Sequence, residues 1–370
     1  MPLTQTPEEL SAWLRLTLEP GIGAAVAREL LKRWGPPQQI FALPPQVLAD
    51  ALPAPLAGRV AGPPSADLSA AIERTLRWAE APGHHLLTLA DAGYPQALLD
   101  IHDPPPVLYV AGDPTRLAHP AIAIVGARHA TPEGLANARA FARHLGRQGW
   151  CIVSGMALGI DTAAHEGALE AEGTGGTVAV VGTGADVVYP ARNRDLSRRI
   201  AAAGAILSEF PLGSPALPHQ FPRRNRLVAG LARGTLVAEA AARSGSLITA
   251  RLAADTGREV FAIPGSIHSP LSRGCHTLIR QGAKLVESAQ DILDELQGTP
   301  AAIAPETAPD ASLPHDALLT ALGYGPVHLD TLAARAELAI PELQARLLEL
   351  ELQGRVVRLD GGRYQRRAAP

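Results

Sequence analysis

Six short apolar runs, separated by segments long enough to form helices, constrain the fold of this chain most strongly. The runs occupy residues 121–125, 151–153, 177–181, 205–207, 235–238 and 260–263. Neighbouring residues in these runs are both apolar, which is typical of parallel strands that are buried on both faces. Strands that alternate with helices predict a Rossmann-like, doubly wound α/β sheet. Such sheets bind ligands at the carboxyl ends of their strands.

The sequence on either side of these runs predicts further domains. Residues 1–82 contain short helical patterns and predict a small helical domain of the SAM or helix-hairpin-helix type. We expect residues 83–297 to form the extended Rossmann-like domain. Residues 298–314 are rich in Ala and Pro and predict a linker. Residues 315–370 contain three helical segments followed by a hairpin signal, which together predict a winged helix.

A tight turn in the first domain allows two interpretations. Gly21 and Gly23 flank Ile22 just before a helical segment. Backbone N–H groups at such a helix start can face a phosphate, as in helix-hairpin-helix modules. The same turn also fits a plain connection within a helical bundle, and the nearby Glu19 and Glu29 favour that simpler interpretation.

The charge of the chain is unevenly distributed. The net charge is −3, but residues 119–296 contain 18 basic and 15 acidic residues and form a cationic region. Lys32 and Lys284 are the two lysines of the sequence, so almost every cation is a guanidinium, which suits phosphate binding through paired hydrogen bonds. An anionic ligand is therefore most plausible on the central domain.

Cysteine content and hydropathy point to the cellular compartment. Cys151 and Cys275 are too far apart in the sequence to suggest a disulfide framework or a zinc motif, and we expect two buried thiols. No run approaches the roughly 18 apolar residues that a membrane-spanning helix requires. These features predict a cytoplasmic protein in a reducing environment.

The first predicted strand of the central domain leads into Gly126, Ala127 and Arg128. Thr131 is the expected N-cap of the following helix. This turn lacks the G-x-G-x-x-G pattern of dinucleotide-binding sites and has an arginine in the loop instead. We expect Arg128 to bind an anion at the strand end, although a solvated surface arginine has the same sequence signature.

The next strand leads into Ser154 and Gly155, followed by Asp161 and His165 on a helix. Their spacing of four residues is compatible with an acid–base pair or with half of a metal site. The sequence offers no clear third ligand. We therefore favour a capping aspartate and a packing histidine, and we expect Gly155 to allow close approach of the backbone.

The segment FPRRNR at 221–226 opens a predicted helix with three arginines. Cations at a helix N-terminus oppose the helix dipole and reduce stability by about 0.3–1 kcal/mol each. We therefore interpret Arg223, Arg224 and Arg226, with Asn225, as ligands for an anion. Phe221 offers a ring on which a base can stack, as in many single-strand binders, although a core position is equally compatible with it.

Two further features bear on function. Ser244, Gly245 and Ser246 precede a predicted helix and either hold a phosphate or cap that helix. The sequence contains no G-x-x-x-x-G-K-[ST], H-E-x-x-H or G-x-S-x-G motif. We therefore expect no catalytic residues, no metal site and no cofactor.

Taken together, several segments resemble the DprA/Smf family. They are VGAR at 125–128, SGMALGIDTAAH at 154–165, GADVVYP at 184–190, SEFP at 208–211, FPRRNR at 221–226 and SGSLITA at 244–250. Their order and spacing make the resemblance specific, and the flanking helical and winged-helix domains extend it over nearly the whole chain. Leu158 departs from the family pattern, in which this position is often basic, so that loop adds no charge.

The resemblance implies a non-enzymatic DNA-processing protein of natural transformation. Such a protein binds and protects incoming single-stranded DNA, loads a RecA-type recombinase during DNA recombination in competent cells, and forms a homodimer. Carried over by motif, the positions that bind nucleic acid are Gly126, Arg128, Ser154, Gly155, Phe221, Arg223, Arg224, Asn225, Arg226, Ser244, Gly245 and Ser246. Phosphates are then expected on the guanidinium groups and a base on the aromatic ring.

Alternative functions predict other sites. A Rossmann-like nucleotide phosphoribohydrolase would use Glu239 as acid/base and Arg226 to hold phosphate, but its P-G-G-x-G-T-x-x-E signature is absent. A transcription regulator would read duplex DNA through its winged helix. The helical segment 341–353 contains Glu342, Glu349 and Glu351, which repel phosphate, so a partner-binding or regulatory role is favoured for this domain. Contact with DNA through the wing stays open, because the wing contains Arg363, Arg366 and Arg367.

Overall fold

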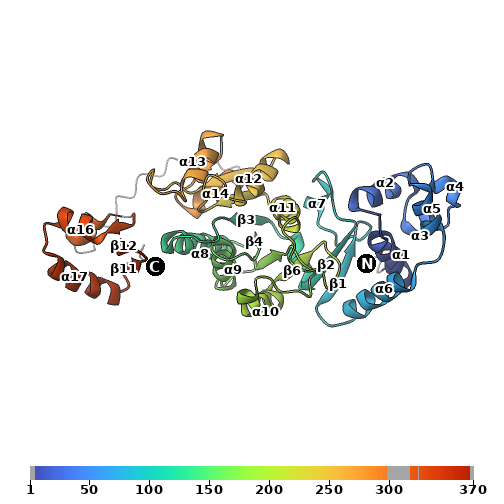
Figure 1. Ribbon diagram of the computed structural model, residues 1–370, viewed down its shortest axis with the longest axis horizontal. Helices are drawn as coiled ribbons and strands as arrows, with labels where there is room; N and C mark the ends of the chain where they lie inside the picture. The colour runs from blue at the N-terminus through green and yellow to red at the C-terminus, as the bar shows by residue number, and fades with distance from the viewer. Residues whose placement is uncertain (1–4, 298–316, 324, 367–370) are drawn as a thin grey trace.

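The computed structural model describes residues 5–297, 317–323 and 325–366. Figure 1 shows the helices of the first domain at one end, a large sheet with its helices in the middle, and a small C-terminal domain at the other end. The proposed linker at 298–314 and the start of the expected helix at His315 lie outside the described residues. In the described parts of the chain, no helix combines the length and hydrophobicity needed to cross a membrane.

The first domain consists of six helices, and one apolar core joins most of them. The helices are α1 (Pro7–Leu18), α2 (Ala24–Trp34), α3 (Pro37–Phe41), α4 (Pro45–Leu48), α5 (Ala54–Ala61) and α6 (Ala66–Ala79). Leu16, Leu30 and Ile40 are fully buried in this core. Thr6 and Glu9 form a capping box that fixes the start of α1. Trp13 and Leu68 belong to a second cluster, through which α1 and α6 pack against the sheet.

The central sheet has nine strands in the order β1-β2-β6-β5-β4-β3-β7-β8-β9. All six predicted strands are present, as β3 (Ala121–Val125), β4 (Cys151–Ser154), β5 (Thr177–Val180), β6 (Ala205–Ser208), β7 (Gly234–Val237) and β8 (Glu259–Ala262). They are parallel to one another, which confirms the Rossmann-like class. The prediction missed the edge strands β1 (His84–Thr88) and β9 (Lys284–Leu285) and also β2 (Val107–Gly112), which lies between β1 and β6. β1 and β2 are antiparallel to their neighbours.

Helices cover both faces of the sheet. They are α7 (Gln96–Leu99), α8 (Pro132–Arg147), α9 (Ile160–Leu169), α10 (Arg194–Ala203), α11 (Gln220–Leu231), α12 (Ser246–Asp255), α13 (Arg273–Arg280) and α14 (Ala289–Gln297), with the short 3₁₀ helices η1 (Pro114–Ala118) and η2 (Ala191–Asn193). One core cluster lies under α11 to α13 and another under α8, α9 and α14. The strand order reverses between β3 and β7, so a crevice is expected at their carboxyl ends.

The C-terminal domain is a winged helix, as predicted. It contains α15 (Ala317–Leu322), β10 (Val327–His328), α16 (Leu329–Ala336), α17 (Ile340–Leu352), β11 (Val356–Leu359) and β12 (Arg363–Arg366). The strands form a separate sheet in the order β10-β12-β11. Leu332, Leu343 and Leu347 are fully buried in its core.

Candidate nucleic-acid interface

A pocket of about 460 Å³ lies at the carboxyl ends of β3 and β4, between the N-terminal end of α11 and the loop from β7 into α12. This is the place where the order of the parallel strands reverses. Most of the predicted site residues line it, namely Gly126, Arg128, Gly155, Phe221, Arg224, Asn225, Ser244, Gly245 and Ser246. The parallel topology thus gathers residues from four distant segments of the chain. Ser154, Arg223 and Arg226 do not line the pocket.

Two glycines allow the walls of the pocket to approach each other closely. A Cβ atom on Gly126 would lie 2.6 Å from Ile160 Cγ1 and 2.8 Å from the backbone oxygen of Glu239. A Cβ atom on Gly155 would lie 2.4 Å from Nη2 of Arg224. Real Cβ contacts are longer than this, so both positions require glycine for steric reasons. Gly155 therefore makes room for a side chain of the protein, the guanidinium of Arg224.

Arg128 has the geometry expected of a ligand-binding cation. Its side chain is exposed and makes no hydrogen bond or ion pair with any residue that the structure describes. The guanidinium carbon lies 6.0 Å from the centre of the Phe221 ring, which is within the range of a cation–π contact. Arg128 thus places an unpaired positive charge beside an aromatic face at the mouth of the pocket.

Arg224, in contrast, is a buried part of the wall, with 5% of its surface exposed. Its Nη1 donates to the backbone oxygens of Gly155, at 2.7 Å, and Val180. Burial lowers the pKa of Arg224 to about 10, and the charge of Asp161 opposes this shift. These bonds hold Arg224 in place, so it contributes a fixed positive charge and cannot swing out to a ligand.

Asp161 and His165 are both structural, but Asp161 does not cap a helix as predicted, because it lies within α9, whose N-cap is Gly159 and has no side-chain cap bond. Asp161 Oδ2 accepts hydrogen bonds from the backbone N–H groups of Gly155, at 3.1 Å, and Ala157, at 3.3 Å. His165 is fully buried, and its Nδ1 lies 2.8 Å from Thr177 Oγ1. Burial, helped by the charge of Arg224, lowers the pKa of His165 to about 3, so the ring is neutral. Asp161 thus orders the loop after β4, and His165 packs α9 against β5.

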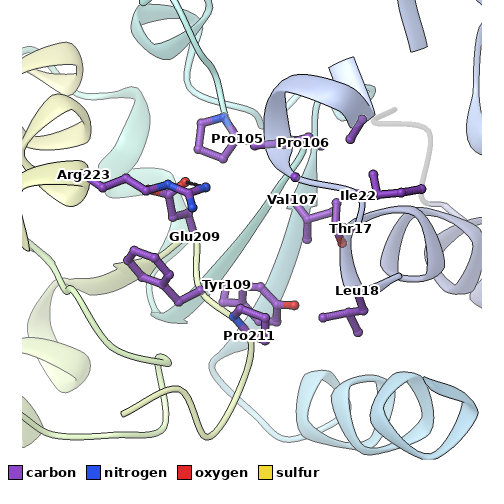
Figure 2. A pocket seen from close by; sticks show the side chains of 14 residues that line it. Thr17, Leu18, Ile22, Pro105, Pro106, Val107, Tyr109, Glu209, Pro211 and Arg223 are labelled. Atoms are coloured by element: carbon purple, nitrogen blue, oxygen red, sulfur yellow. Dashed lines mark hydrogen bonds and ion pairs between the residues drawn. The ribbon is translucent and has the colours of Figure 1, made fainter. Parts of the chain in front are cut away.

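Arg223 and Arg226 lie outside the pocket and bind carboxylates of the chain. Arg226 Nε lies 3.0 Å from Asp103 Oδ2, and Arg226 Nη2 pairs with Glu209 Oε2. Arg223 Nη2 donates to the same Glu209 oxygen at 3.0 Å. Figure 2 shows these two side chains next to each other. The cluster of arginines at the start of α11 predicts an external anion. For these two residues the compensating charge is internal, because Glu209 and Asp103 supply it.

The serines have mixed roles. Ser154 is fully buried, and its hydroxyl donates to the backbone oxygen of Ile124 at 2.6 Å, so it ties β4 to β3. The hydroxyls of Ser244 and Ser246 lie 2.7 Å apart beside the first turn of α12. Thr131 caps α8 as predicted, because its hydroxyl accepts from the Gly134 N–H at 3.0 Å. Of the three serines predicted as site residues, Ser244 and Ser246 remain candidates for ligand contact.

Tyr189 is a pocket residue that we did not predict. Its side chain is 45% exposed, and its ring centre lies 5.4 Å from that of Phe221. The sequence contained a signal for it, because Tyr189 is an aromatic residue in the loop after the predicted strand β5. Ile248, which is 43% exposed, lines the pocket from α12. The pocket therefore has an aromatic and apolar edge next to its cationic one.

The turn at Gly21 and Gly23 faces a different cavity, of about 150 Å³, between the helical domain and the sheet. Figure 2 shows Ile22 and Thr17 on one side of it and Tyr109, Glu209 and Arg223 on the other. Gly21 has a φ of +96°, which favours glycine at this turn. Gly23 is the N-cap of α2 and provides no side-chain cap. The plain connection within the helical bundle stays the favoured prediction for this turn, with DNA contact as the alternative.

Comparison with known sequences gives a consistent set of relatives. The family model for DNA recombination-mediator protein A matches residues 85–297, and the model for the DprA winged helix domain matches residues 302–362. Protein Smf of Escherichia coli (strain K12) is 42% identical over 307 residues, which cover 80% of this chain and 82% of that protein. DNA processing protein DprA of Streptococcus pneumoniae (strain ATCC BAA-255 / R6) is 47% identical over 210 residues, which cover 57% of this chain and 73% of that protein.

Two solved structures are similar in fold and in sequence. The structure of DNA processing protein A from Streptococcus pneumoniae has a TM-score of 0.68 at 38% identity and covers 79% of this chain and 99% of that chain. A structure of DNA processing protein A from Helicobacter pylori has a TM-score of 0.52 at 33% identity and covers 58% of this chain and 96% of that chain. The latter is described as giving insight into a single-stranded DNA binding mode.

Proposed function

Because this chain belongs to the DprA/Smf family of DNA recombination mediators, we propose that it binds single-stranded DNA at the pocket between α11 and α12. One observation supports this proposal most directly. The unpaired guanidinium of Arg128 lies beside the Phe221 ring, and Tyr189 extends the aromatic surface. Positive charge next to stacking surfaces is the usual equipment of proteins that bind single strands.

The geometry suggests how a strand is held. A phosphate binds near Arg128 and the start of α12, where the helix dipole favours an anion. A base then stacks on the exposed ring of Tyr189 or on the half-buried ring of Phe221. Every base has a π face, and phosphates carry no sequence information, so binding of this kind does not depend on sequence.

The family relationship supports further parts of the proposal. We propose that the protein protects incoming DNA during natural transformation, loads a RecA-type recombinase and acts as a cytoplasmic homodimer. We also propose that the domains span residues 1–82, 83–297 and 315–370, with the linker at 298–314. The description of the family as a recombination mediator supports the recombinase as a partner.

The alternative enzymatic function loses its candidate acid/base. Glu239 accepts hydrogen bonds from the backbone N–H of Thr131, at 2.9 Å, and from its hydroxyl, at 2.5 Å. This carboxylate therefore supports the cap of α8. Arg226, the proposed phosphate ligand of that enzyme, is paired with Glu209 and Asp103. We accordingly propose a role in binding without catalysis.

The proposal is tested by titrating the full chain into fluorescently labelled oligothymidine and following the anisotropy. A duplex of the same length and label serves as the comparison. We expect tighter binding to the single strand and a nuclease-resistant complex. Equal or tighter binding to the duplex, or no binding to oligothymidine, would contradict the proposal.

A further inference from the structure

The cavity between the helical domain and the sheet contains a buried hydroxyl without a protein partner. Tyr109 lines this cavity and is 2% exposed, and its Oη makes no hydrogen bond with any residue that the structure describes. Buried tyrosine hydroxyls usually have a partner. Figure 2 shows this hydroxyl turned toward α1. Burial, together with the charge of Asp186, raises the pKa of Tyr109, so the hydroxyl keeps its proton and is available as a donor.

The start of α2 forms another wall of the same cavity. Gly23 and Ala24 line it, and their backbone N–H groups make no hydrogen bond with a described residue. The dipole of this helix of 11 residues places positive potential there. The sequence alone favours a plain connection for the turn before α2. The unpartnered hydroxyl of Tyr109 in the same cavity favours the alternative, in which the turn faces an anion.

Arg223 adds further donors. Its side chain is 46% exposed, and its Nη2 donates to Glu209, whereas its Nε and Nη1 make no hydrogen bond in the described part of the chain. Glu209 also lines the cavity, but it is 2% exposed and pairs with both Arg223 and Arg226. Since Arg226 also pairs with Asp103, the charges of these side chains cancel. The start of α2 therefore makes the cavity positive.

We propose that this cavity is a second phosphate site, where the Tyr109 hydroxyl, the N–H groups at the start of α2 and Arg223 donate to one phosphate group. A phosphate carries acceptors and a negative charge, which matches a set of donors at a helix start. The cavity of about 150 Å³ has room for about five water molecules, and a phosphate group also has five heavy atoms.

The phosphate belongs to the bound strand, and this part of the inference rests on the proposed function. The first turn of α11 separates the two sites, because Phe221 and Arg224 line the pocket described above and Arg223 lines the cavity. A helix with its side chains is about 10–12 Å across. One flexible strand therefore reaches both sites within a few nucleotides.

The variant Ala24→Asp tests the site in the full chain, because it places a carboxylate at the first position of α2, in the wall of the cavity. Ala25→Asp is the matched control, since Ala25 is exposed, lies in the same helical turn and does not line the cavity. The helix dipole favours both aspartates, so neither variant should have a lower melting temperature than the wild type. We expect Ala24→Asp to bind a long oligothymidine at least tenfold more weakly than Ala25→Asp, because hydrogen bonds to a charged group are lost. Equal affinities would overturn the inference.

The variant Tyr109→Phe makes a smaller change, because it removes the hydroxyl and keeps the ring. Its melting temperature should not fall, since the hydroxyl has no protein partner among the described residues. Its affinity for the long oligothymidine should fall about tenfold, for the loss of one hydrogen bond to a charged group. Tyr364→Phe, in the core of the winged helix, is the control and should bind like the wild type. Unchanged affinity in Tyr109→Phe would refute the role of the hydroxyl.

Two further measurements separate the bound strand from a free phosphate. The difference between Ala24→Asp and Ala25→Asp should be absent for the shortest oligothymidine that binds and should appear as the strand becomes longer. Calorimetry with inorganic phosphate and with thymidine monophosphate measures binding of the free group. If Ala24→Asp loses either small ligand but binds long oligothymidine like Ala25→Asp, the assignment to the strand is wrong.

The proposed function is tested separately from this inference. If Arg128→Ala weakens binding of oligothymidine and Ala24→Asp does not, the proposed function stands and the second site is refuted. A wild type that does not bind oligothymidine would overturn the proposed function and, with it, the assignment of the phosphate to a strand.

Discussion

The guanidinium of Arg224 occupies the space that a side chain at position 155 would need, since a Cβ atom on Gly155 would lie 2.4 Å from Nη2 of Arg224. Arg224 in turn binds the backbone oxygen of Gly155 at 2.7 Å. The glycine and the arginine thus form one structural unit at the ends of β4 and β5. A change at either residue should disturb the wall of the pocket without removing a ligand contact.

We expect Gly155→Ala to destabilise the protein by about 1–3 kcal/mol, the usual cost of overpacking a well-packed site. It should also weaken binding to oligothymidine, because a displaced Arg224 no longer holds the pocket residue Asn225, to whose Oδ1 its Nε donates at 3.2 Å. Urea unfolding and anisotropy measure the two effects. Gly58→Ala is the control, because a Cβ atom there meets nothing within 4 Å. A fully stable Gly155→Ala would contradict this account of the pocket wall.

Arg128→Ala should weaken binding without affecting stability, since Arg128 is exposed and has no ion pair among the described residues. Each phosphate contact with a single strand contributes about −0.7 to the slope of log affinity against log salt concentration. The slope should therefore become flatter by about 0.7. Arg147→Ala, at the exposed end of α8, removes the same charge at the opposite edge of the sheet and should leave the slope unchanged.

Arg226 should behave differently from Arg128, although our sequence analysis assigned both to DNA binding. Its side chain is 10% exposed and pairs with Glu209, which is 2% exposed. Arg226→Met should destabilise the protein by about 3–5 kcal/mol, because it removes one of the two arginines that pair with a buried carboxylate. The salt slope of DNA binding should not change. A stable variant with a flatter slope would show that Arg226 contacts phosphate after all.

The loss of stability in Arg226→Met should depend on pH. Burial raises the pKa of Glu209, while the charges of Arg226 and then Arg223 oppose this shift. Without Arg226 the folded protein favours the protonated carboxyl more strongly than the unfolded chain does. Stability should therefore decrease as the pH rises from the ordinary pKa of a glutamate through the raised one. Urea midpoints for wild type and variant across the acidic range test this, and a constant difference would contradict it.

Tyr189→Ala should lower the affinity for oligothymidine by about 1–3 kcal/mol, the usual effect of removing a stacking side chain. The salt slope should stay the same, because no charge is removed. Tyr189→Phe is the control and should retain the affinity. The wild type should bind oligothymidine more tightly than an oligonucleotide with abasic sites, and Tyr189→Ala should reduce this difference. If the ratio of the two affinities is the same in Tyr189→Ala as in the wild type, the ring does not stack on a base.

The sequence was sufficient to predict the six central parallel strands because those strands are buried on both faces and therefore apolar throughout. β1 was not predicted because it begins with His84 and His85, which are polar and only half buried at the edge of the sheet. The convergence of Gly126 and Arg128 with the start of α11 followed from topology alone. Parallel strands bring their carboxyl ends together, whatever the sequence distance between them.

The roles of the arginines could not be predicted in the same way. Three arginines lie close together in the sequence at 223, 224 and 226, but their partners come from other segments. Arg223 pairs with Glu209, Arg226 with Asp103, and Arg224 with the backbone of Gly155. The sequence shows an excess of positive charge in the first turn of α11, where the helix dipole is unfavourable for cations. The sequence does not show whether the compensating negative charge comes from the chain or from a ligand. That distinction depends on tertiary packing.

The bonds from Arg224 to the backbone oxygens of Gly155 and Val180 join the ends of β4 and β5 before any ligand arrives. The protein therefore gives up little conformational freedom when a strand binds, and the ordering cost falls mainly on the flexible DNA. Single strands that are already extended, for example under tension or held by another protein, should for this reason bind more tightly than relaxed ones of the same length.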